Sequence, residues 1–145
     1  MEPLEQEHAY KLKNAKEERL PYKLFKSSSG EIIKVARSAI DGEQMLKLMP
    51  SNHFWLHVLT GEGSHVWLEK PKGEKKPSPI AIREASILAV HHSKHSRAQS
   101  ADVQIAHKSD IEKKKNLPVG KVLVRRCETQ FIRYNDDELK KVLEN

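Results

Sequence analysis

Phe54-Trp-Leu-His-Val-Leu-Thr-Gly-Glu-Gly-Ser-His-Val-Trp-Leu68 carries the clearest structural signal in this chain. It holds both tryptophans of the sequence and two of its eight histidines, with a Gly-Glu-Gly break between two apolar runs. Short runs of β-branched and aromatic residues around a glycine turn are typical of a β-hairpin. The stretch therefore predicts two antiparallel strands with Gly61 at the tip.

Strand alternation predicts how the two runs of this hairpin face each other. One side carries apolar pairs, Phe54 with Leu68 and Leu56 with Val66. The other side carries indole and imidazole pairs, Trp55 with Trp67 and His57 with His65. Register follows the hydrophobic pattern where one face of a sheet is buried. We expect the apolar pairs to face the core, one tryptophan to join them there, and the histidines to lie nearer the rim.

The segments around the hairpin complete an α+β pattern. The expected strands lie at 22–26, 31–37, 102–107, 121–126 and 129–134. The expected helices lie at 42–49 after a capping Asp41, from Pro79 to about Ser96, and beyond Asn135 or Asp136. The second of these helices is a candidate cover for the tryptophan side of the hairpin. This order predicts a single α+β domain with a largely antiparallel sheet and two to three packed helices.

Composition divides the 145 residues into a charged N-terminal extension, 1–20, and one domain, 21–145. The extension is dense in Glu and Lys, which predicts a solvated helix or frayed segment, or alternatively a docking arm. No apolar run has the ~18 residues that a membrane span requires, and residues 1–7 lack the basic and apolar regions of a signal peptide. With Cys127 as the single cysteine, these features lead us to expect a cytoplasmic protein without membrane contact.

The histidines invite a metal or hydrolytic hypothesis, which the sequence supports weakly. His91 and His95 are four apart on a predicted helix, but a zinc site needs a third ligand and no His-Glu-x-x-His is present. His57 and His65 have no carboxylate patterned to orient them. Gly61 to Ser64 lacks the lysine and following helix of a phosphate loop. We predict no catalytic residue, metal or cofactor.

Basic clusters give the binding hypothesis better support. The net charge is +6 and the isoelectric point about 9.4, a balance that favours polyanionic partners. Cations gather at Lys94/Arg97, at Lys113–Lys115 and at Arg125/Arg126. Lysine and arginine attract phosphates, and indole or imidazole rings stack on unpaired bases. At the end of the Pro79 helix, however, cations are also favoured by the helix dipole alone.

An ordered set of motifs then resembles the NFACT-R domain, which occurs in NFACT ribosome-quality-control proteins and alone in small proteins. The resemblance runs from about Tyr22 to Tyr134, and its carriers are the Ser-Ser-Gly turn before Val35-Ala36-Arg37, Phe54-Trp55-Leu56-His57, Gly63-Ser64-His65-Val66, Glu84-Ala85-x-x-Leu88-Ala89-x-x-x-Ser93-Lys94, and Lys113-Lys114…Pro118-x-Gly120-x-Val122. The chain departs from the family at Ala36, His53 and His92, where glycine, an acidic residue and an aromatic residue are usual. It also lacks the other domains of full-length members, so we do not expect it to recruit tRNA for tailing by itself.

The resemblance implies an α+β domain that contacts ribosomal RNA or tRNA rather than catalysing a reaction. The positions that match the family's polar and basic residues are Arg37, His57, Ser64, His65, Ser93, Lys94, Lys113 and Lys114. Our candidate RNA-binding set adds their neighbours Trp55, Arg97, Lys115 and Arg125.

We therefore expect a non-catalytic RNA-binding module that acts in translation or ribosome quality control. Structured RNA is the expected partner, either rRNA or tRNA, and the large ribosomal subunit is a candidate assembly. Two alternatives stay open: a histidine-based, metal-dependent hydrolase or nuclease, and a protein–protein adaptor that uses residues 1–20. The sequence leaves open which RNA is bound, whether DNA is bound, and the oligomeric state.

Overall fold

The computed structural model describes residues 20–145, so the predictions for residues 1–19 lie outside the described part. Six antiparallel strands form one sheet in the order β1-β2-β4-β3-β5-β8. Their bounds are β1 Tyr22–Lys26, β2 Ile32–Ala36, β3 His53–Val58, β4 Val66–Glu69, β5 Ser100–His107 and β8 Glu128–Arg133. The helices are α2 Ala39–Leu48, α3 Pro79–His91 and α4 Asp136–Glu144. The predicted α+β domain with a largely antiparallel sheet is confirmed.

The hairpin of β3 and β4 lies at the centre of this sheet, and its register is the predicted one. Trp55 pairs with Trp67, Phe54 with Leu68 and Leu56 with Val66. His57 and His65 lie just beyond these pairs with their ring centroids 5.2 Å apart. Strands β2 and β5 extend the sheet on either side, so the tryptophan hairpin organises the whole sheet.

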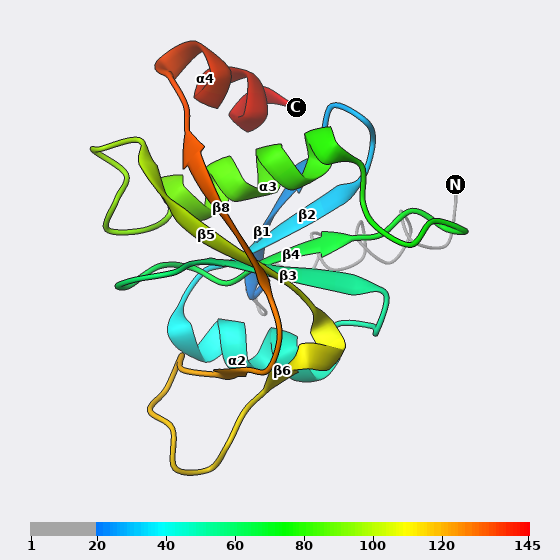
Figure 1. The fold of residues 1–145 in the computed structure, drawn as a ribbon, viewed down its shortest axis with the longest axis vertical. Helices are drawn as coiled ribbons and strands as arrows, with labels where there is room; N and C mark the ends of the chain where they lie inside the picture. Colours follow the sequence, from blue (N-terminus) through cyan, green and yellow to red (C-terminus); the bar gives the residue numbers. More distant parts are fainter. Residues whose placement is uncertain (1–19) are drawn as a thin grey trace.

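The sheet has helices on both faces (Figure 1). Helix α3 packs on the face that carries Phe54, Leu56 and Val66, and its buried alanines allow a close approach. Helix α2 and its Met45 cover the other face, which carries both tryptophans. Trp55 is 2% exposed and Trp67 is fully buried. The expectations of one buried tryptophan and of a cover by the helix at Pro79 are therefore wrong, because α2 supplies the apolar cover for the second face.

Two helix boundaries differ from the predictions for local reasons. Helix α2 begins at Ala39 because the Ser38 hydroxyl, not Asp41, caps it by accepting from Asp41 N at 3.1 Å. Helix α3 ends at His91 instead of near Ser96 because the hairpin tip bonds to the segment that follows. Ser64 N donates to His92 O at 3.1 Å, and Lys94 N donates to Glu62 O at 3.1 Å. No helix among the described residues is long and apolar enough to span a bilayer.

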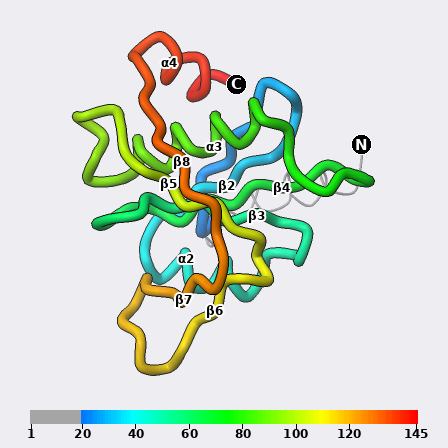
Figure 2. Tube along the Cα trace, viewed as in Figure 1, coloured from blue at the N-terminus to red at the C-terminus, as the bar shows by residue number. Residues whose placement is uncertain are grey.

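The segment between β5 and β8 forms a separate unit next to α2. It contains a 3₁₀ turn at Lys108–Asp110 and a two-stranded ribbon of β6, Ile111–Glu112, and β7, Leu123–Val124. The strand predicted over 121–126 is limited to Leu123–Val124, and it pairs with β6 instead of joining the main sheet. The loop between β6 and β7 projects from the α2 side of the molecule (Figure 2). This places a cation-rich loop beside the tryptophan face.

Candidate functional site

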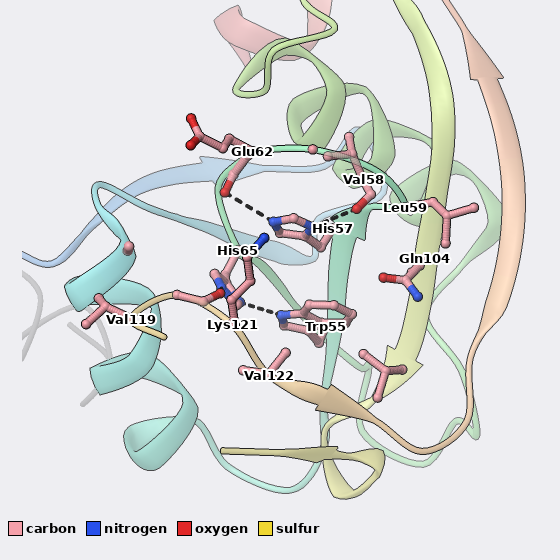
Figure 3. Close-up of a pocket in the computed structure, with 15 residues that line it drawn as sticks. Trp55, His57, Val58, Leu59, Glu62, His65, Gln104, Val119, Lys121 and Val122 are labelled. Atoms are coloured by element: carbon pink, nitrogen blue, oxygen red, sulfur yellow. Dashed lines mark hydrogen bonds between the residues drawn. The ribbon is translucent and has the colours of Figure 1, made fainter. Parts of the chain in front are cut away.

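A pocket of about 550 Å³ lies on the face of the sheet that carries the tryptophans (Figure 3). Side chains of β3 and β5 line it from the sheet, namely Trp55, His57 and Gln104. The hairpin tip around Gly61 lines one side, and residues 119–122 line another. We call this cavity the hairpin pocket.

His65 connects the hairpin to the segment beyond β6. Trp55 Nε1–H donates to His65 Nδ1 at 2.7 Å, and His65 Nε2 lies 3.0 Å from Gly120 O. Because Nδ1 accepts the hydrogen bond from the indole, it carries no hydrogen itself. The imidazole is therefore neutral with its hydrogen on Nε2, which donates to Gly120 O. Burial lowers the pKa of His65 to about 4, and the neighbouring His57 adds to this effect. His65 is therefore a neutral structural link rather than a surface contact.

His57 holds the hairpin tip from inside the pocket. Its ring is parallel to the Trp55 indole, with an interplanar angle of 3° and centroids 5.6 Å apart. Its two nitrogens face Val58 O at 2.7 Å and Gly63 O at 3.1 Å. These two carbonyls favour the charged ring, but burial is the larger effect, and the net pKa of His57 is lowered.

Lys113 fastens the cation-rich loop to α2. Its amine lies 2.6 Å from Glu43 Oε1 and donates to the carbonyls of Leu117, Pro118 and Lys121 at 2.6–3.1 Å. The same carboxylate accepts from Gly120 N at 2.8 Å, and the Lys113 hydrogen bond lowers the pKa of Glu43. Lys113 stays a predicted RNA contact, and in this structure its amine is bonded to acceptors within the fold. Through these bonds Lys113 fixes the position of the loop between β6 and β7 relative to α2.

The cluster after α3 is also divided between anchors and exposed groups. Ser93 Oγ donates to Val90 O at 2.7 Å and accepts from His95 N at 3.0 Å. Ser64 is half-buried where its backbone N–H meets α3. The side chain of Lys94 is exposed and lies against Gly61, where an added Cβ would sit 2.9 Å from Nζ. Arg97 is exposed.

The remaining predicted cations lie on the surface. Arg37, Lys114, Lys115 and Arg125 are exposed. Arg125 forms a hydrogen-bonded ion pair with Glu112, which Lys114 also approaches at 4.0 Å. Residues 113–126, which we call the basic segment, contain six cations and no acidic residue. Charge is thus concentrated on a segment that Glu43 and His65 hold in place.

Sequence reasoning missed three residues of this site. Gln104 lies opposite His57 in the ladder of β3 and β5, and a single polar residue in a strand gave no signal. Lys121 lies beside His57, as its effect on the His57 pKa reflects, but it stood apart from the predicted lysine cluster. Glu43 lies within the helix expected at 42–49, where the sequence alone indicates no partner for it. Its position close to Lys113 in space depends on the tertiary fold.

The metal hypothesis can be compared with the side chains of residues 20–145. Within that range, no group of three His, Cys, Asp or Glu side chains is placed to hold a metal ion. The ring nitrogens of His57 and His65 face the Trp55 indole and three backbone carbonyls. The geometry around these two histidines favours structural roles and a binding surface.

Comparisons with known proteins bear on the family and the fold of this chain. The model of the NFACT protein RNA-binding domain matches residues 22–126. No curated protein matches the chain. Among solved structures, the C-terminal part of a fibronectin/fibrinogen-binding protein from Streptococcus suis superposes with a TM-score of 0.75 and 21% identity, over 86% of this chain and 50% of that one. At this identity the likeness supports the fold. Because the family model covers most of the described domain, the chain belongs to the family of NFACT protein RNA-binding domains.

Proposed function

We propose that this protein binds structured RNA, either ribosomal RNA or tRNA, without catalysing a reaction on it. The single observation that carries the proposal is the basic segment, residues 113–126, which holds six cations and no acidic residue. Membership in a family of RNA-binding domains supports RNA as the polyanion. Folded RNA presents phosphates at fixed spacing, and cations on a held segment can match that spacing.

The way the segment is fastened strengthens this proposal. Lys113 and Glu43 hold the loop from within, and His65 binds Gly120 from the hairpin. Lys114 and Lys115 are then left exposed. A surface that is ordered before binding loses less conformational entropy when it binds. We infer that these two lysines contact phosphates and that Lys113 acts only through the loop.

The wider setting is part of the same proposal. We propose that the protein works in the cytoplasm, in translation or ribosome quality control, and that the large ribosomal subunit is the assembly it contacts. The structural likeness to half of the Streptococcus suis chain supports the fold alone, so it carries no weight for the cellular setting.

Fluorescence anisotropy with labelled tRNA, rRNA fragments and a DNA duplex of matched length tests the proposal. We expect wild type to bind RNA at low salt and Lys114→Ala/Lys115→Ala to bind several-fold more weakly. The matched control is Lys72→Ala/Lys75→Ala, which removes two exposed lysines from the loop before α3 and should leave binding near wild type. Absence of RNA binding at low salt, or equal loss in both double variants, would contradict the proposal. Co-sedimentation with purified large subunits tests the assembly.

A further inference from the structure

We propose that the hairpin pocket accepts one unpaired nucleotide of the bound RNA, with the base inside and its phosphate at Lys121. This inference rests on the proposed function and adds a site to it. The basic segment would hold the RNA backbone, and the pocket would take a base that leaves the helical stack.

The size and lining of the pocket fit a base. At about 550 Å³ it lies within the range of small-molecule sites, roughly 300–1,000 Å³. The His57 ring is half-buried and stands in parallel with the Trp55 indole behind it. Val119 and Val122 add apolar surface. Unpaired RNA bases are commonly held by stacking on rings of this kind within apolar walls.

Polar groups at the pocket suit the edge of a base. The Gln104 side chain reaches the pocket from β5 beside His57. Within residues 20–145 its amide has only a 3.7 Å contact with Cys127 Sγ. A side-chain amide carries two donor hydrogens and an acceptor oxygen, and this combination pairs with the exposed edges of bases. Gln104 is therefore the residue we assign to the base.

The mouth of the pocket suits a phosphate. Lys121 lines the pocket together with His57, whereas Lys94 lies against Gly61 at the hairpin tip, outside that lining. Neither amine forms an ion pair within the described residues. Glu62 is the acidic residue at this rim, but its carboxylate is turned away from the His57 ring (Figure 3). The Lys121 amine at this opening favours a phosphate there.

The pocket is also formed before any ligand binds. The Trp55–His65–Gly120 hydrogen bonds join the β3 side of the pocket to residues 119–122. His57 joins the same side to the hairpin tip through Gly63 O. A base that enters such a site therefore need not order it first.

The test compares two RNA hairpins of equal length, one with a single bulged nucleotide in its stem and one fully paired. We expect wild type to prefer the bulged RNA by about tenfold, the range that stacking of one base supports. Gln104→Ala should reduce that preference without weakening binding to the paired stem. Val119→Trp places an indole at the pocket mouth and should abolish the preference for bulged RNA. The control Leu48→Trp introduces the same indole at an exposed position of α2 and should keep the preference for bulged RNA.

Tryptophan fluorescence gives a second readout. Trp67→Phe leaves Trp55 as the single tryptophan, and Trp67 Nε1 has no hydrogen-bond partner to lose within the described part. Bulged RNA should change the Trp55 emission, and paired RNA should not. Equal affinity for the two RNAs, or a preference that survives Val119→Trp, would overturn the pocket inference while the proposed function stands. Binding to neither RNA would overturn the proposed function itself.

Discussion

At the scale of single residues, His65 shows how one buried side chain can join two parts of a site. It is 3% exposed and accepts from the Trp55 indole while donating to Gly120 O. Both hydrogen bonds require the neutral ring with its hydrogen on Nε2. The identity and the protonation state of this residue therefore both affect stability.

Replacing His65 tests its role as a link. In His65→Ala the Trp55 indole N–H and the Gly120 carbonyl both lose their partner, and each buried polar group left unpaired costs about 1–3 kcal/mol. We expect a loss of roughly 2–4 kcal/mol in the free energy of unfolding, measured by urea denaturation. His65→Gln, whose amide can still donate to Gly120, should lose less. Equal stability of wild type and His65→Ala would contradict this assignment.

Acid should weaken the fold through the same residue. The pKa of His65 is about 4 in the folded protein, against an ordinary value of 6.5. Between these values the unfolded chain binds the extra proton, so the stability that the neutral ring supports falls as pH decreases from about 6.5 to about 4. His65→Gln should flatten the stability profile in this window by up to ~1.4 kcal/mol per pH unit. If the urea midpoints of wild type and His65→Gln change by the same amount between pH 7 and pH 4, the assignment of this pH dependence to His65 is wrong.

At the scale of elements, the packing of α2 against the hairpin organises the site. Gly42 is buried in α2, and a Cβ at that position would lie 2.7 Å from His65 Cδ2. The helix also supplies Glu43, which holds the basic segment through Lys113 and Gly120 N. The tryptophans, the imidazoles and the basic segment thus meet because α2 lies close to the sheet.

The Gly42→Ala variant tests this close approach. In an unconstrained helix, alanine would stabilise by about 0.5–1 kcal/mol relative to glycine. Here the new methyl group meets a ring that two hydrogen bonds fix in place. We expect a net destabilisation of about 1–3 kcal/mol, as for other overpacked cores, in chemical denaturation. A stabilised Gly42→Ala would show that the helix moves freely.

Removal of the amine at Lys113 should loosen the basic segment. In Lys113→Met the carbonyls of Leu117, Pro118 and Lys121 lose their shared donor. Hydrogen–deuterium exchange should then accelerate at residues 117–121, including the Gly120 amide, while the exchange of α3 stays unchanged. Lys114→Ala is the control, because its amine lies 4.0 Å from one exposed carboxylate. Equal exchange in both variants would contradict the positioning role of Lys113.

At the scale of the whole molecule, the predictable part of the fold is the part that local patterns encode. The register of β3 and β4 follows from alternation around Gly61, and the structure has the predicted pairs. The packing of α2 on the tryptophan face was not predictable from the sequence. Either the helix at 42–49 or the helix from Pro79 could cover that face, and only tertiary packing decides between them. The acceptors around Lys113 were not predictable either, because a sequence displays charge but not the groups that surround it in space.

The combined picture is a rigid sheet that holds a basic segment and a preformed pocket on one face. We propose that the exposed lysines of that segment, Lys114 and Lys115, bind RNA. The most direct measurement is the slope of log K against log salt concentration for a structured RNA, with wild type and Lys114→Ala/Lys115→Ala. Each phosphate contact contributes about −0.9 on duplex and −0.7 on single strands. We predict a slope shallower by about 1–2 in the double variant. Identical slopes for the two proteins would contradict the claim.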